Sequence, residues 1–353
     1  MRTWLVIAVL TFLCVGPALG VTYEMHDLGA VALSAINNQG QIVGTMEMAD
    51  GTEHAFVWQQ GHVTDLGLGW GQGINDLGQV TFYSGTNNNC EATIWQGGVV
   101  SAIPGADPGS CNSLAINNEG QVIGATTGGQ GWIWQDGNFT YLGTMGGAVG
   151  STPLALNNVG QVIGYTVKSD GHTGAPFIWQ DGEMSSIPGI PSADSLNAVS
   201  DSGVIAGSDW NYYEGSAWTE ACIWQNGTRT FLGTLANPRD WWQISVATDI
   251  SNHGQAVGWS NTDDADGRIC AFVWQDGVMM DLGTLGGENS RANAINDDGW
   301  IVGWAQTAEG EVHGVLWTPV PEPSSMLCIL AGLSPMFYLF RSRGKLPRST
   351  RSS

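Results

Sequence analysis

Tryptophan is the residue of this chain best suited to ligand contact, because an indole offers a flat apolar face on which a sugar ring can stack. Seven of the 17 tryptophans keep a regular spacing, and nine others within the repeat region stand outside it. These nine are Trp70, Trp132, Trp210, Trp218, Trp241, Trp242, Trp259, Trp300 and Trp304. The candidate ligand-binding residues are those in insertions or at loop mouths, namely Trp210, Trp241, Trp242, Trp259 and Trp304. Packing inside the fold is the alternative role for the same side chains.

Acidic residues and histidines give weaker signals for metal binding or catalysis. The run from Asp263 to Gly267 holds three aspartates, but the distal glutamate that a hand-type calcium loop needs is absent. Asp-Gly pairs are also ordinary turn signals. The six histidines have no metal-ligand spacing, and no nucleophile elbow or phosphate loop occurs. We therefore predict no cofactor and no enzyme, with calcium at this one run as the alternative.

The regularly spaced tryptophans reveal the elements that must position these residues. They return at intervals of 37 to 50 residues, at Trp58, Trp95, Trp134, Trp179, Trp224, Trp274 and Trp317. Such a period, built of short apolar runs and glycine turns, predicts repeated units that bury apolar faces on their neighbours. We expect the seven tryptophans to lie in the core between adjacent units.

Two turns recur within each unit. The first reads Asn or Ser, any two residues, then Gly, as at Asn37 to Gly40, and it occurs seven times. Its first side chain can accept a hydrogen bond from the backbone two residues on. Its glycine can take positive φ, which closes a type I turn with a bulge between antiparallel strands. The second turn follows the tryptophan, as at Trp58 to Gly61, and joins two further strands.

Seven units of four short antiparallel strands predict an all-β fold, a seven-bladed β-propeller over residues 21–319. Residues 23–29 read as the fourth strand of a unit, whereas the last unit stops after its third strand, at Trp317. We therefore expect the N-terminal strand to close the ring by pairing beside the strand that ends at Trp317. Propellers assemble sites from distant loops, so a polysaccharide lyase or hydrolase is the alternative function from the enzyme class.

Four cysteines lie in the repeat region, at Cys90, Cys111, Cys222 and Cys270, and their spacings match no zinc pattern. Disulfides persist in exported proteins. A bond between Cys90 and Cys111 would close a short loop between adjacent units. Cys222 and Cys270 each precede a repeat tryptophan and could face each other, with buried thiols as the alternative.

Both ends of the chain carry localisation signals. Residues 1–20 read as a cleavable secretory signal, with Arg2, an apolar core and small residues before the cleavage position; a buried first strand is the alternative. Residues 320–353 combine a Pro-Glu-Pro motif, an apolar run at 326–340 and a basic tail. The run is short for a stable membrane span, which needs about 20 residues. The tail fits the positive-inside tendency, so we expect membrane contact through a short hydrophobic helix. An ordinary C-terminal anchor is the alternative.

The repeat region is strongly acidic. The whole chain has a formal charge of −21. All but five basic residues lie in the two ends, which leaves residues 21–319 near −26. Nucleic acid is therefore not a predicted partner, since phosphates need a basic footprint.

The repeats resemble the extracellular HAF-repeat family, whose units carry an Ile-Asn-x-x-Gly turn, a His-Ala-Phe strand and a Leu-Gly-Thr-Leu-Gly-Gly segment. His54-Ala55-Phe56 and the segment from Leu282 to Gly287 match literally, and the resemblance covers about residues 23–317. It implies the architecture and no particular chemistry.

The C-terminal end resembles the PEP-CTERM sorting signal of Gram-negative bacteria, with Pro321, Glu322 and Pro323 at its eponymous motif. This resemblance implies processing by an exosortase-type enzyme and delivery to the cell envelope, the outer surface or the extracellular space. The predicted function is a non-catalytic exopolysaccharide-binding or surface scaffold protein. A purely structural surface protein without ligand is a further alternative.

Overall fold

The computed structural model describes residues 12–14, 21–86, 89–106, 115–190, 195–213, 216–236, 244–263 and 267–321, and these form β-strands, turns and loops without a helix. No described segment is therefore a helix long and apolar enough to cross a membrane. The predicted sorting helix, Glu322 and Pro323 lie outside the described residues, as does most of the predicted signal peptide.

The strands form six antiparallel sheets. The largest runs in chain order through β3 (Val31–Ile36), β4 (Ile42–Glu47), β5 (Glu53–Gln59), β6 (His62–Ile74), β7 (Val80–Thr86), β8 (Asn89–Gln96) and β9 (Val99–Ala102). The first half of β6 pairs with β5 and its second half with β7, so this sheet joins two repeat units through one long strand.

Four further sheets each contain one repeat unit of four strands in chain order. The first two are β10 (Ala115–Ile116), β11 (Val122–Ala125), β12 (Gly131–Gln135) and β13 (Asn138–Tyr141), then β14 (Gly150–Leu156), β15 (Val162–Val167), β16 (Thr173–Gln180) and β17 (Glu183–Ser186). The next two are β18 (Ser195–Val199), β19 (Ile205–Tyr213), β20 (Ser216–Gln225) and β21 (Thr228–Gly233), then β22 (Ser245–Ile250), β23 (Ala256–Asn261), β24 (Ile269–Gln275) and β25 (Val278–Asp281).

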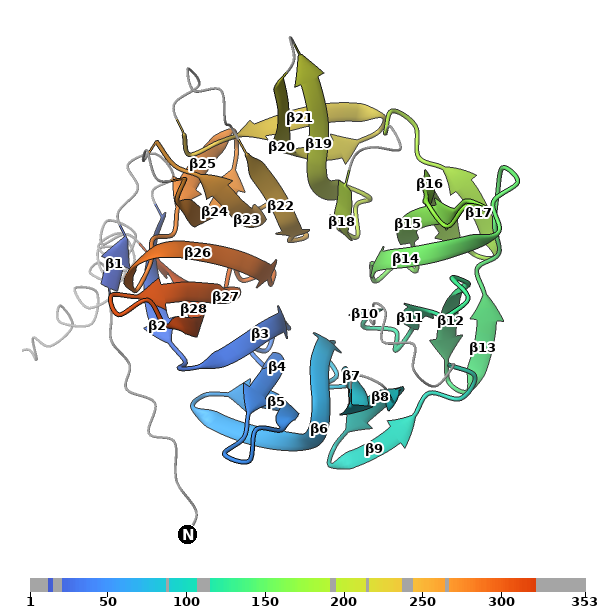
Figure 1. Cartoon of the computed structure of the whole chain (residues 1–353), viewed down its shortest axis with the longest axis horizontal. Helices are drawn as coiled ribbons and strands as arrows, with labels where there is room; N and C mark the ends of the chain where they lie inside the picture. Colours follow the sequence, from blue (N-terminus) through green and yellow to red (C-terminus); the bar gives the residue numbers. More distant parts are fainter. Residues whose placement is uncertain are drawn as a thin grey trace, which may run out of the picture.

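The last sheet joins the two ends of the repeat region. Its order is β1 (Phe12–Cys14), β2 (Val21–Asp27), β28 (Val312–Pro321), β27 (Ile301–Thr307) and β26 (Gly286–Ile295). Met25 lies opposite Trp317, which confirms the predicted pairing of the N-terminal strand beside the last tryptophan strand. Figure 1 shows the sheets arranged as a ring, with β3 beside β26.

Two details differ from the expected boundaries. β28 continues to Pro321 and so includes the first residue of the predicted sorting motif. Phe12–Cys14, assigned from the sequence to the signal peptide, pairs with β2 from its outer edge. Because β2 has its other edge on β28, closure of the ring does not depend on β1.

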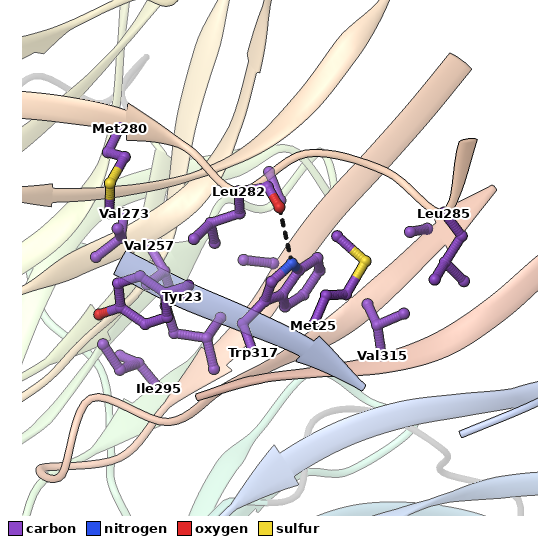
Figure 2. Packing of buried hydrophobic residues seen from close by; sticks show 14 residues of the cluster. Tyr23, Met25, Val257, Val273, Met280, Leu282, Leu285, Ile295, Val315 and Trp317 are labelled. Carbon is purple, nitrogen blue, oxygen red and sulfur yellow. Dashed lines mark hydrogen bonds between the residues drawn. The ribbon is translucent and has the colours of Figure 1, made fainter. Parts of the chain in front are cut away.

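The core is divided among the units. The described residues form seven buried apolar clusters, and each contains or contacts one of the seven regularly spaced tryptophans. Trp179, Trp224 and Trp317 are buried, as predicted, whereas four are only partly buried and pack against their clusters, namely Trp58, Trp95, Trp134 and Trp274. In the cluster of Figure 2, Tyr23 and Met25 of β2 pack beside Trp317, whose Nε1 donates to the carbonyl of Leu282 at 3.0 Å. Each large side chain removed from such a cluster costs about 3 kcal/mol or more of folding free energy.

Both recurrent turns have the geometry that their glycines require. In the first, Gly40 has φ of 70° and its N–H donates to the carbonyl of Asn37, while Asn37 Oδ1 accepts the N–H of Gln39. The second turn has positive φ at both central residues, for example 49° at Gln60 and 84° at Gly61. This is a type I′ hairpin turn, whose twist matches that of the strands.

A side-chain pair explains two of the sequence motifs. The histidine of His-Ala-Phe, His54, lies with Nδ1 2.9 Å from Asp65, the residue before the Leu-Gly that ends the fourth strand. His313 contacts Asp27 at the same distance in the closing sheet. Asp27 Oδ1 also accepts the N–H of Gly29. Asp65 likewise accepts the N–H of Gly67. Each aspartate thus fixes the backbone where the chain leaves the fourth strand, and its contact with histidine connects the third strand to the fourth.

Candidate functional site

The ring has two faces. Strands alternate in direction within each unit, so the two recurrent turns lie at one face, here called the turn face. The loops that connect the second strand to the third, and one unit to the next, lie at the opposite face, here called the loop face. Trp259 on β23 and Trp304 on β27 occupy equivalent positions near the loop face.

The structure brings these two predicted tryptophans together around one cation. The guanidinium of Arg291 lies 4.4 Å from the ring centroid of Trp259 and 5.9 Å from that of Trp304. Such cation–π contacts orient both partners. Burial lowers the pKa of Arg291, and its buried Nε has no hydrogen-bond partner among the described atoms. Arg291 therefore holds Trp304 in place beside the neighbouring cavity.

A cavity of about 400 Å³, here called the loop-face cavity, lies next to Trp304. Its wall includes Trp304 from the last unit and Trp70 from the second unit, on either side of β3. It is lined by Ala30, Val31, Ala32, Leu33, Thr45, Glu47, Glu53, Trp70, Asn293, Trp304 and Val312. Trp70 Nε1 donates to Glu53 Oε2 at 2.8 Å, which fixes this indole.

Two carboxylates share this cavity. Glu47 on β4 and Glu53 on β5 are directly opposite in the antiparallel register, and both are exposed. Aromatic walls with carboxylate acceptors suit a ring that carries hydroxyl groups, because the indoles cover its apolar face and the carboxylates accept its O–H donors. The sequence reasoning missed Arg291 and both glutamates, since only the folded ring places them beside the tryptophans.

The other predicted ligand residues are elsewhere or undescribed. Trp210 on β19 is 55% exposed and does not line the loop-face cavity. Trp241 and Trp242 lie outside the described residues, and so do 264–266 of the candidate calcium run. Within the described part of the chain, no group of three or more His, Cys, Asp or Glu side chains is arranged to hold a metal ion.

The cysteines divide into two kinds. Cys90 is disulfide-bonded, and its predicted partner Cys111 lies outside the described residues. Cys222 and Cys270 are buried and carry thiols, so the structure gives the second of the two alternatives for this pair. Cys270 instead forms a hydrogen bond with Asp281, the residue that corresponds to Asp65 and Asp27 in other units.

The seven first turns converge at the centre of the ring and form a closed circle. In every unit the residue after the leading Asn or Ser donates its backbone N–H to the side-chain Oδ1 of its counterpart in the next unit, at 2.7–2.9 Å. The members in order are Asn38, Asp76, Asn118, Asn158, Asp201, Asn252 and Asp297, and Asp297 donates back to Asn38.

Three of the seven members of the circle are aspartates, and no two aspartates are adjacent. Each of its three aspartates stands between two asparagines, whose amides donate to the second carboxylate oxygen, as Asn38 and Asn118 do to Asp76. The circle lines a central cavity of about 200 Å³. Since both oxygens of each carboxylate accept hydrogen bonds within the ring, the arrangement is accounted for by closure of the fold.

One carboxylate links first strands deeper in the ring. Asp249 stands where other units have alanine or glycine, such as Ala35 and Gly73. It accepts the N–H groups of Ile250 at 2.8 Å and Ile295 at 2.9 Å, which ties β22 to β26. Burial raises the pKa of Asp249 to about 6.

Comparison with known proteins defines the fold class. No protein-family model matches this sequence, and no curated protein is significantly similar to it. Among solved structures, the acylaminoacyl peptidase of Pyrococcus horikoshii is 10% identical with a TM-score of 0.53, over 87% of this chain and 51% of the peptidase. TolB from Acinetobacter baumannii is 10% identical with a TM-score of 0.42, over 80% of this chain and 64% of TolB.

YCF48 from Cyanidioschyzon merolae is 11% identical with a TM-score of 0.41, over 84% of this chain and 98% of YCF48. The chain thus spans about half the length of the peptidase and just under two thirds of TolB. At these identities a likeness concerns the fold alone. The ring of antiparallel sheets, together with the likeness to the peptidase, assigns the chain to the all-β class and its β-propeller architecture.

Proposed function

We propose that the chain is an exported seven-bladed propeller that binds polysaccharide at its loop face without catalysis. The blade count is supported by seven core clusters and by the closed circle of seven turns. The sheet that runs from β3 to β9 then counts as two blades that share β6.

The loop-face cavity is the observation that carries polysaccharide binding. Trp304 and Trp70 are both half-buried and both line it, and each is fixed by a contact, Trp304 with Arg291 and Trp70 with Glu53. Preorganised aromatic side chains lose little conformational freedom on binding, which favours affinity. The net charge of −21 and the two glutamates favour a neutral glycan over an acidic one.

Retention on immobilised neutral polysaccharides (cellulose, xylan and dextran) tests this proposal. We expect the protein to be retained on at least one of them, and Trp304→Ala or Trp70→Ala to weaken retention by tenfold or more. Trp210→Ala is the matched control, because it removes an exposed indole that lies outside the cavity. No retention on any matrix, or equal retention of the three variants, would contradict the proposal.

Export and envelope delivery are part of the proposal and rest on the two ends and on the resemblance to HAF-repeat and PEP-CTERM proteins. The expected processing enzyme is of the exosortase type. Intact mass of the protein recovered from the producing cells tests both cleavages. A recovered mass equal to that of the whole chain would contradict them.

A second candidate function is polysaccharide hydrolysis, favoured by the cross-strand placement of Glu47 and Glu53 in one cavity. Paired carboxylates are the usual acid and base of glycoside hydrolysis. This function predicts new reducing ends from the glycan that is bound, and their loss in Glu47→Gln and Glu53→Gln. Binding without new reducing ends decides for the non-catalytic function.

A further inference from the structure

A second cavity lies at the turn face, where the last unit meets the first. It has a volume of about 690 Å³ and is here called the closing pocket. It is lined by Glu24, His26, Leu28, Gln39, Gly40, Trp58, Gln60, Gly61, Trp300, Leu316, Thr318 and Pro319. It shares no residue with the loop-face cavity, so nothing argued from it rests on polysaccharide binding there.

An equivalent pocket between the third and fourth units shows which features are special. This internal pocket, of about 450 Å³, is lined by Gln121, Ile133, Gln135, Asp136, Asn138, Thr140, Trp179, Asp181 and Gly182. Each of these nine residues has a counterpart in the closing pocket at the same position of the repeat. The two pockets can therefore be compared residue by residue.

The first difference is an added aromatic wall. Five units place a glutamine directly after the first turn, and each bonds the glutamine that follows its own repeat tryptophan, as Gln121 Nε2 does with Gln135 Oε1. In the last unit this glutamine is replaced by Trp300, and its partner by Thr318, which contacts His26 at 2.9 Å. Trp300 packs over the turn glycine of the first unit, Gly40. Its ring and that of Trp58 both line the pocket.

The second difference is the position of the carboxylates. The internal pocket has the exposed turn residues Asp136 and Asp181, which Pro319 and Gln60 replace in the closing pocket. The closing pocket instead has a carboxylate on a strand. Glu24 on β2 occupies the position of Asn138 on β13, since Glu24 lies opposite Thr318 just as Asn138 lies opposite Gln135. Glu24 is half-buried and is the single carboxylate among the described residues of the pocket wall, which holds no lysine or arginine. The closing pocket thus combines two indoles with one negative charge, in a chain of net charge −21.

We propose that the closing pocket is a binding site for an organic cation, with a quaternary ammonium group between the indoles of Trp58 and Trp300 and Glu24 as its counter-ion. Alkylated ammonium groups are attracted to aromatic faces and are weakly hydrated, so they enter such pockets more readily than metal ions do. The acidic surface raises the local concentration of any cation. The volume leaves room for a chain attached to the ammonium group.

Titration of the purified protein with choline, followed by NMR, tests this assignment against 3,3-dimethyl-1-butanol, the neutral carbon analogue of choline. We expect choline to bind at least tenfold more tightly than the alcohol, and its affinity to fall as salt is raised. Equal binding of the two compounds, or binding of a neutral trisaccharide in place of choline, would overturn the assignment.

Variants locate the site. Trp300→Gln restores the residue found in five other units, so it preserves the fold, and it should weaken choline binding at least tenfold, whereas Trp300→Phe should keep most of it. Glu24→Gln should weaken binding tenfold and remove most of its salt dependence. Trp304→Ala, on the loop face, should leave choline affinity unchanged, which separates this site from the polysaccharide site. Unchanged choline affinity in Trp300→Gln would also overturn the proposal.

Discussion

The closing pocket and the internal pocket are built on the same repeat positions but differ in what holds them. At the internal pocket, the type I′ turn at Asp136 and Gly137 joins the third and fourth strands of the third unit, β12 and β13. The glutamine pair Gln121 and Gln135 connects the second and third strands of the same unit. In the last unit the corresponding strands are β28 and β2, which belong to opposite ends of the repeat region. Trp300 and Thr318 replace the glutamine pair there, and Glu24 takes the place of Asn138.

This difference separates two roles of the same repeat position, stabilisation of the unit and contact with a ligand. In five units the glutamine after the first turn bonds a second glutamine of the same unit, as Gln41 does with Gln59. In a sixth unit this position holds Val204, which packs in an apolar cluster. The last unit is held by paired strands and by the buried side chains of Tyr23 and Met25. The glutamine position of this unit is therefore not needed for stability, and it can hold a side chain that suits a ligand, here Trp300.

Removal of β2 should have the largest effect. A chain that begins at Leu28 loses the strand that covers β28 and exposes the cluster around Trp317. Burial of this cluster is worth a large share of the 5–15 kcal/mol typical of a folded protein, so we expect loss of cooperative thermal unfolding. A chain that begins at Val21 is the control and should unfold cooperatively. A cooperative transition in the shorter chain would show that the closing strand is dispensable.

Single residues at equivalent positions should differ in the same direction. Met25 is fully buried, whereas its counterpart Phe139 is half-buried and contacts Trp132. We expect Met25→Ala to lower the free energy of unfolding by about 3 kcal/mol and Phe139→Ala by about 1–2 kcal/mol. Denaturant unfolding measures both. A larger loss at Phe139 would reverse the comparison.

Stability should depend on pH through Asp249. Its pKa is raised from 3.8 to about 6 in the folded state, so the folded protein holds this proton more tightly than the unfolded chain does. Any stability linked to this proton is fully present below pH 4 and lost as pH rises to about 6.

Asp249→Asn should therefore gain stability relative to the natural protein between pH 4 and pH 7, by about 1–3 kcal/mol. Unfolding in urea at the two pH values measures this change. The same difference in free energy at pH 4 and pH 7 would contradict the pKa argument.

The smallest effect is expected for Trp300→Gln on stability. Trp300 is half-buried at the rim of its core cluster, and glutamine is compatible with this position in five other units. We expect a loss of about 1 kcal/mol in the free energy of unfolding. A loss above about 3 kcal/mol would mean that Trp300 is chiefly a core residue.

The repeat made the ring predictable from sequence, because a turn glycine and a tryptophan that packs on the core recur at the same positions of every unit. The pairing of residues 23–27 with β28 followed from counting strands at the two ends. Trp259 and Trp304 were both predicted as ligand residues, but only Trp304 lines the loop-face cavity. Arg291 joins the two through a contact between units that spacing does not reveal.

The central circle and the closing pocket escaped prediction for another reason. Asn38 and Asp297 are 259 residues apart in the chain and bond only because the ring closes. Trp300 was recognised as lying outside the regular spacing, but its meaning appears only when it is aligned with the glutamines of other units. Aligning the seven units position by position would have shown that substitution.

Hydrogen exchange of the two equivalent fourth strands tests the closed ring most directly. β2 in the closing sheet and β13 in the third unit occupy the same place, one made by the N-terminal end and the other by a hairpin. If the first strand is paired with β28 in solution, amides of 21–27 should exchange as slowly as those of 138–141. Exchange of residues 21–27 within seconds, while 138–141 remain protected, would contradict a ring closed by this strand.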